Sequence, residues 1–210
     1  MREGMLAFIY RWSAVVLVVG GVCLAASYLL HPDSAPTETV ASGFWQVIHT
    51  GFLISLLGGI FGLGGLLAHG LDRGAGKASV FGYAMGVVSL VLIAGLDYAE
   101  IFIFPTLAVE FPAVVEKYGA GESMPSVAFA FPLAGLLFFL GFLTFLSQLH
   151  ATESVGRSSS IISMVGVVVF TVGLSGFVPM IVVKVGASLF GLGLVLLGAS
   201  LWTVSRETTL

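Results

Sequence analysis

Residues 43–68 read GFWQVIHTGFLISLLGGIFGLGGLLA and carry one ionisable side chain, His49. A helix needs about 20 predominantly apolar residues to cross a hydrocarbon core about 30 Å thick. In the bilayer, every backbone polar group must be satisfied inside the segment, and an α-helix does this. This stretch is therefore predicted to be a transmembrane helix.

The rest of the chain repeats this pattern. Of 210 residues, 58% are hydrophobic and 9% are charged, whereas an ordinary soluble domain has about 25% charged residues. Polar or Gly/Pro-rich segments separate the apolar runs. The sequence predicts an all-α integral membrane protein, with residues 1–210 forming a single transmembrane domain and a six-helix transmembrane bundle. The predicted spans are 12–30, 43–68, 79–108, 126–149, 159–176 and 179–203.

The boundary between the last two spans rests on Ser175, Gly176 and Pro179. Proline does not always end a membrane helix, because neighbouring groups can satisfy the freed backbone. The main alternative is a five-span protein whose last helix is long and kinked.

The basic residues predict the orientation. Lys and Arg collect in cytoplasmic loops, and six of the eight basic residues fall on one side of the six-span arrangement: Arg2, Arg11, Arg73, Lys77, Arg157 and Arg206. Both termini are therefore predicted to be cytoplasmic. The predicted location is the bacterial inner membrane, where the protein is multi-pass. The other side holds Lys184 and an acidic loop, 109–125, which is a candidate interfacial helix over the outer mouth of the bundle.

A short motif hints at three related helical hairpins. Phe61-Gly62-Leu63-Gly64 in the second span recurs as Phe190-Gly191-Leu192-Gly193 in the sixth, and Phe139-Leu140-Gly141-Phe142 lies in the fourth. Gly-rich apolar sequence also produces such matches by chance, so both explanations stay open.

Ionisable groups inside a membrane span are costly, and each needs an explanation. His49 lies in the second span, Asp97 and Glu100 lie in the third, and Lys184 lies in the sixth. The predicted orientation places all four toward the non-cytoplasmic side. Gln46 and His49 are three residues apart, as are Asp97 and Glu100, so each pair lies on one helix face. These five residues are the candidate ligand- or proton-binding site.

Three interpretations of this cluster remain open. In the structural one, Lys184 either extends to the membrane interface or pairs with Asp97 or Glu100, and His49 hydrogen-bonds a carboxylate. In the second, a buried carboxylate exchanges a proton or binds a cationic solute. In the third, His49, Asp97 and Glu100 bind a metal ion, since imidazole and carboxylate ligands suit Zn, Mn or non-haem Fe.

A haem site is also conceivable, because membrane cytochromes hold haem between His pairs. His69 and His150 lie at the cytoplasmic ends of the second and fourth spans. Each also borders a loop, where an exposed His is common. Whether any cofactor is bound is therefore left open.

Partners are predicted from composition. The net charge of -3, with Lys and Arg totalling 8, argues against nucleic-acid binding. The lipid bilayer is the expected environment. Glycines at close-packing spacing, Gly58/Gly62 and Gly82/Gly86, let helices approach closely, mostly within the bundle but also in a homo-oligomer or a larger membrane complex.

Three functions follow as hypotheses. The first is a small transporter-like or ligand-binding protein with its polar site in the outer half of the bilayer. The second is an accessory subunit of a larger complex, and the third is a haem- or metal-binding redox subunit. No residue pattern points to an enzyme.

Overall fold

The computed structural model describes residues 2–118 and 125–207, and all regular secondary structure in these ranges is α-helical. This confirms that the protein is all-helical, and the six-span topology stays a prediction. Glu122 of the acidic loop lies outside the described residues. The helices are α1 (Arg2–Leu30), α2 (Thr37–Val40), α3 (Gly43–Asp72), α4 (Lys77–Phe102), α5 (Phe104–Glu110), α6 (Pro112–Tyr118), α7 (Pro125–Ala151), α8 (Arg157–Gly173) and α9 (Met180–Glu207).

Within these ranges, five helical segments are long and apolar enough to cross a membrane. They are Gly4–Leu30, Gly43–Asp72, Lys77–Glu110, Val127–Ala151 and Met180–Glu207. Helix α8 has 17 residues, which at about 1.5 Å per residue spans about 26 Å, less than the hydrocarbon core. The sixth crossing, 159–176, therefore stays a prediction.

The alternative of one long, kinked last helix is wrong. Helix α8 ends at Gly173 and α9 begins at Met180. Between them, Gly176 has φ = 78°, a conformation that glycine adopts without a steric penalty. The two helices then pack antiparallel. A Cβ on Gly173, at the end of α8, would lie 2.7 Å from the Cα atom of Val183, near the start of α9.

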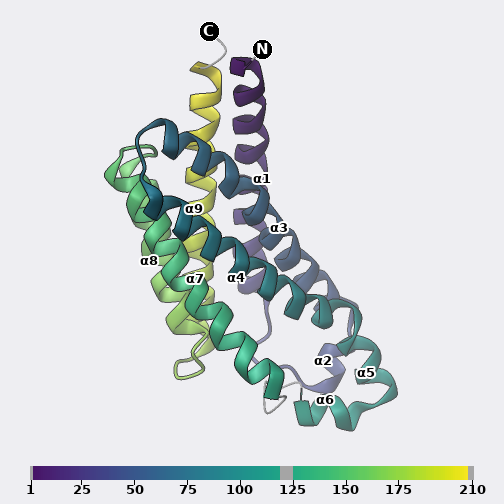
Figure 1. The fold of residues 1–210 in the computed structure, drawn as a ribbon. Helices are drawn as coiled ribbons and strands as arrows, with labels where there is room; N and C mark the ends of the chain where they lie inside the picture. The colour runs from purple at the N-terminus through teal and green to yellow at the C-terminus, as the bar shows by residue number, and fades with distance from the viewer. Residues whose placement is uncertain (1, 119–124, 208–210) are drawn as a thin grey trace.

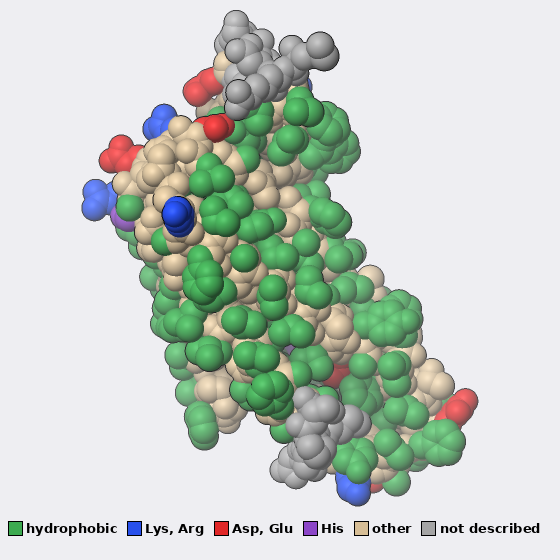
Figure 2. All heavy atoms as spheres, viewed as in Figure 1, with side chains coloured by type: hydrophobic (Ala, Val, Ile, Leu, Met, Phe, Trp, Pro, Cys, Tyr) green, Lys and Arg blue, Asp and Glu red, His purple; other side chains and the backbone are tan. Residues whose placement is uncertain are grey.

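The long helices contact one another in a closed cycle: α1 packs on α3, α3 on α4, α4 on α7, α7 on α8, α8 on α9, and α9 on α1. Both chain termini lie at one end of the molecule (Figure 1). We call this the terminal end and the opposite one the far end. Figure 2 shows hydrophobic side chains over most of one face, with charged side chains mainly toward the two ends. This distribution is typical of a protein embedded in lipid.

Four aromatic residues fill the centre of the cycle, and we call them the phenyl cluster: Phe138, Phe142, Phe170 and Phe190. Phe190 meets Phe138 and Phe142 edge to face, with ring centroids 5.4 and 5.1 Å apart. Beside them lies an apolar cavity of about 20 Å³ to which α1, α3, α4, α7, α8 and α9 all contribute. The core therefore separates the two ends of the molecule.

The predicted glycine faces are used inside the molecule. A Cβ on Gly58 would lie 2.6 Å from the carbonyl oxygen of Val16, and one on Gly82 would lie 2.6 Å from the backbone nitrogen of Phe145. A Cβ on Gly62 would likewise meet Leu17. These glycines let α3 approach α1 and α4 approach α7, and an assembly with another subunit stays a prediction.

The third predicted span, 79–108, is interrupted. Helix α4 ends at Phe102, and α5 begins at Phe104 with Pro105 in its first turn. Proline has no N–H to donate to the carbonyl four residues earlier, which is that of Ile101. The side-chain Nε2 of Gln46 donates to this oxygen at 3.2 Å and so satisfies the carbonyl that Pro105 leaves free.

Helices α2, α5 and α6 gather at the far end (Figure 1). Together with Trp45 of α3, they form a small second core, which we call the cap: Val40, Trp45, Ala108 and Val115. Helix α6 falls in the acidic loop where a short helix was predicted. Because Trp45 belongs to α3, the cap is anchored to the long helices.

The proposed repeat motif occupies different environments in its two best copies. The side chain of Phe61 is 69% exposed, whereas that of Phe190 is 4% exposed in the core. The three-hairpin relationship stays a prediction.

Candidate functional site at the far end

The site is centred on a buried pair contributed by neighbouring helices. Nδ1 of His49, on α3, lies 2.6 Å from Oδ1 of Asp97, on α4. Residue exposures are 9% for His49 and 3% for Asp97. The two residues stand about 9 Å or less from the far ends of their helices, at about 1.5 Å per residue. The structure brings these two predicted site residues into contact, and their role as a binding site stays a prediction.

Each member of the pair has a second polar atom without a hydrogen-bond partner among the described residues. These atoms are Nε2 of His49 and Oδ2 of Asp97, and both are fully buried. Burying a polar group without a compensating hydrogen bond costs free energy, so native structures satisfy nearly all such groups. Two unsatisfied atoms on one pair therefore mark a place where a further proton or ligand atom can bind.

Aromatic rings surround His49. Its ring centroid lies 4.5 Å from that of Trp45 and 5.5 Å from that of His31, which is the first residue after α1. His31 also lies edge-on to Trp45 at 5.2 Å and stacks on Tyr28 at 6.2 Å. Sequence analysis missed His31 because it lies in a loop beyond a helix end.

The ring of His31 is held by a local hydrogen bond. Its Nδ1 lies 2.8 Å from the carbonyl oxygen of Pro32, and because a carbonyl accepts hydrogen bonds, Nδ1 carries the proton. Burial lowers the pKa of His31 below its ordinary value of 6.5, the bond to Pro32 opposes this shift, and nearby His49 and Lys184 add to it.

This lowered pKa predicts a pH-dependent stability. Below pH 6.5, the unfolded chain binds a proton at His31 more readily than the folded chain does, so the free energy of unfolding falls as the pH falls. Replacing His31 by Gln should flatten this dependence between about pH 7 and about pH 5. Chemical unfolding in detergent at several pH values measures it. An unchanged slope in H31Q, with H150Q as the control, contradicts the prediction.

Lys184 does not neutralise either predicted carboxylate. Its Nζ lies 2.7 Å from Oδ1 of Asp33, whose side chain is 77% exposed. The predicted pairing of Lys184 with Asp97 or Glu100 is therefore wrong, whereas the hydrogen bond of His49 to a carboxylate, which the same interpretation included, is present. The long lysine side chain reaches from the start of α9 to the loop after α1, and so it ties the segment containing His31 to α9.

Glu100 and Gln46 lie at the edge of the site. Glu100 is partly buried and interacts electrostatically with His49 and Asp97. Gln46 is exposed, and its side chain donates a hydrogen bond to the carbonyl oxygen of Ile101. Gln46 therefore has a structural role and does not contact the pair.

The structure does not support the metal hypothesis. In the two described ranges, no three His, Cys, Asp or Glu side chains come together as a group that could hold a metal ion. His49 and Asp97 meet as a pair, but Glu100 does not join them as a third ligand.

The two histidines proposed for haem lie in separate surroundings. Nδ1 of His150 lies 2.7 Å from the hydroxyl oxygen of Ser160. His69 lies edge-on to Tyr10 at 5.7 Å and lines an open cavity of about 720 Å³ at the terminal end. His150 is not among the residues that line this cavity. The arrangement therefore offers no observation in favour of a shared haem.

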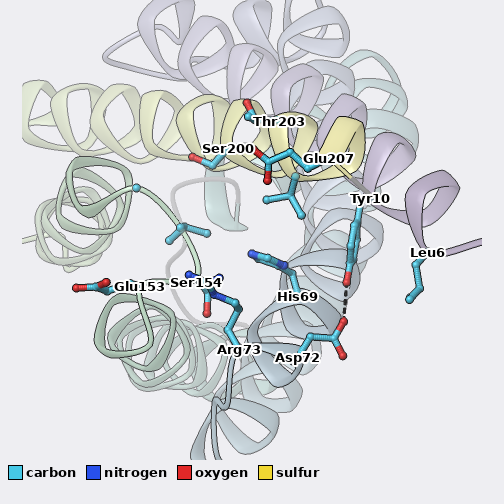
Figure 3. Close-up of a pocket in the computed structure, with 13 residues that line it drawn as sticks. Leu6, Tyr10, His69, Asp72, Arg73, Glu153, Ser154, Ser200, Thr203 and Glu207 are labelled. Atoms are coloured by element: carbon cyan, nitrogen blue, oxygen red, sulfur yellow. Dashed lines mark hydrogen bonds between the residues drawn. The ribbon is translucent and has the colours of Figure 1, made fainter. Parts of the chain in front are cut away.

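Figure 3 shows this terminal-end cavity, where the hydroxyl of Tyr10 donates to Oδ2 of Asp72 at 2.9 Å. This bond links α1 to the end of α3. The remaining lining is mixed, with Arg73, Glu153 and Glu207 among its charged residues. It combines both signs of charge with apolar side chains, and so it does not select one class of ligand.

Removing the hydroxyl of Tyr10 should weaken this link. A hydrogen bond to a charged group contributes about 1.5 kcal/mol or more when it is well shielded, and Asp72 is exposed, so we expect Y10F to lose about 1 kcal/mol or less. The thermal unfolding of Y10F in detergent should be compared with that of Y98F, since Tyr98 is 53% exposed. Equal losses in the two variants contradict a role for the Tyr10 bond.

Comparison of the chain with known protein families, with curated proteins and with solved structures finds no match. The function must therefore be argued from the geometry of the far-end site.

Proposed function

We propose that this protein is a small transporter-like or ligand-binding membrane protein whose site is the His49–Asp97 pair and whose ligand is a proton. The observation that carries the proposal is the buried 2.6 Å contact with one unsatisfied polar atom on each partner. A buried acid and base placed together, with polar atoms left unsatisfied, are typical of functional sites.

We favour a proton over a larger solute because neither cavity described above reaches the His49–Asp97 pair. The cavities at the core and at the terminal end are not lined by His49 or Asp97, and the rings of His31 and Trp45 lie directly against His49. A proton needs no cavity. It needs a lone pair, and the pair presents one on Nε2 of His49.

Binding one proton changes the charge of the site. With neutral His49 and ionised Asp97 the pair carries one negative charge, and with one further proton it is neutral overall. In a medium of low dielectric constant this difference is large, because the attraction between charges is weakly screened. The pair is therefore a site whose charge follows the proton concentration of the phase to which it is connected.

The arrangement of basic residues supports an outward-facing site. Arg73, Lys77 and Arg157 begin or precede helices at the terminal end, and Lys and Arg favour the cytoplasmic side. We propose that both termini are cytoplasmic, that the far end faces outward, and that the membrane is the bacterial inner membrane. The accessory-subunit hypothesis stays an alternative without a specific supporting contact.

The experiment is proton uptake by the purified protein in lipid nanodiscs. After a step to lower pH, the parent should take up about one proton per chain more than D97N does, because the other titratable groups are the same in both. The infrared band of the Asp97 carboxylate should shift in the parent, and this shift should be absent in D97N. The matched control is E110Q, since Glu110 is exposed at the end of α5. Parent-like uptake and an unchanged carboxyl band in a folded D97N variant would contradict the proposal.

A further inference from the structure

Two rings pack against His49 and against each other, and they differ in chemistry. Trp45 is 5% exposed and packs within the cap. His31 is partly exposed and belongs to the loop that follows α1. Trp45 cannot carry a proton between phases, whereas an imidazole can take up a proton at one nitrogen and release it.

The tautomer of His31 leaves the required atom free. Because Nδ1 donates to the carbonyl of Pro32, the lone pair of the neutral ring is on Nε2. In His49 the same holds: Nδ1 faces Asp97 and Nε2 has no partner among the described residues. Each ring thus uses Nδ1 for an anchoring bond and keeps Nε2 for exchange.

The two rings are close enough for a transfer. Their centroids lie 5.5 Å apart with an angle of 74° between the ring planes. At this separation a small ring rotation, or one intervening water molecule, is enough to bring a donor within reach of an acceptor. The Lys184–Asp33 ion pair holds the loop of His31 against α9 and keeps the two rings adjacent.

We propose that His31 is the relay residue through which the proton enters the His49–Asp97 pair from the far-end surface. This inference rests on the function proposed above. An external acid protonates Nε2 of His31. The N–H bond of His31 then breaks as an N–H bond forms at Nε2 of His49. His31 returns to its neutral form, and the pair becomes an imidazolium–carboxylate pair with no net charge.

Other titratable or charged groups also face this route, and the experiment must take each of them into account. Asp97 and Glu100 come from α4, Tyr28 comes from α1, Lys184 comes from α9, and Asp33 comes from the loop itself. Glu100 is the competing entry, because it is a partly buried carboxylate that interacts with both members of the pair. The experiment must therefore separate His31 from Glu100.

The test is the rate of proton uptake after a stopped-flow pH step, with the parent protein and the variants in nanodiscs. A relay changes the rate of the uptake that depends on Asp97 and leaves the amplitude of that uptake unchanged, so in H31F the same Asp97-dependent amplitude should be reached about 100-fold more slowly. Added imidazole should restore the rate in H31A. The variant H31Q can keep the bond to the Pro32 carbonyl, and it provides the same test if H31F does not fold. H150F, at the terminal end, should keep the parent rate.

Three results would overturn the relay. They are a parent-like rate in H31Q and H31F, a slow rate in E100Q with a normal rate in H31Q, or a reduced amplitude in a folded His31 variant. The last would make His31 part of the binding site itself. Failure of the proposed function is distinct, because then D97N keeps the uptake that the parent shows.

Discussion

Replacement of Gly186 by leucine is expected to separate α8 from α9 and to lower the free energy of unfolding by about 3 kcal/mol. A Cβ at Gly186 would collide with the backbone nitrogen and Cα of Phe170, and one at Gly166 would collide with the same atoms of Phe190. The colliding atoms are backbone, so they cannot move aside by a change of rotamer. Two helices must shift instead.

The matched control is G95L, because a Cβ at Gly95 meets nothing within 4 Å. Both substitutions place a leucine within an apolar helix, so they share the same change in helix propensity and hydrophobicity. Unfolding in detergent, followed by circular dichroism, should show a large loss in G186L and a small change in G95L. Equal stability of the two variants contradicts the close approach of α8 and α9.

The second large effect is expected at the buried pair. At a pH low enough for the pair to have taken up its proton, the pair is an imidazolium–carboxylate pair. Removing one partner of a buried ion pair costs about 3 kcal/mol or more, because the other partner is left uncompensated. D97L leaves Nδ1 of His49 without its acceptor. The double variant H49L/D97L removes both polar groups and should recover most of the loss.

A double-mutant cycle with H49L, D97L and H49L/D97L measures this coupling. Neutral hydrogen bonds between membrane helices average about 0.6 kcal/mol, so a coupling energy well above that value identifies an ionised pair. A coupling energy near or below it contradicts the ion pair, even if all variants fold. The cycle measures stability alone, so it requires no measurement of proton uptake.

Much of the fold could be predicted from the sequence because a membrane helix is determined by the length of its apolar run. The start of α3 at residue 43 and the break around Gly176 follow from local composition and backbone preference, whereas α3 continues four residues beyond its predicted end at residue 68. The break at Ile103 was missed because Pro105 acts together with Gln46, which is 55 residues away along the chain from Ile101. No local pattern reveals such a partnership.

The site was predicted in part. His49 and Asp97 were identifiable because an ionisable group in an apolar run needs a partner. The predicted partner of Lys184 was wrong because a lysine side chain is long, and because Asp33 lies in a loop whose path the sequence does not define. His31 had one available signal: it follows a helix that ends on the same side as the predicted cluster.

The position of the phenyl cluster has an electrical consequence. Along α3, the site at His49 comes first, then Phe52 and Gly59 beside the central cavity, and then His69 at the terminal end. In a membrane, most of the transmembrane voltage falls across the layer of lowest dielectric constant, and the apolar core around the phenyl cluster belongs to that layer. A proton that reaches His49 from the far end has crossed little of the field. A proton that passed the rings would cross most of it, at about 2.3 kcal/mol per 100 mV.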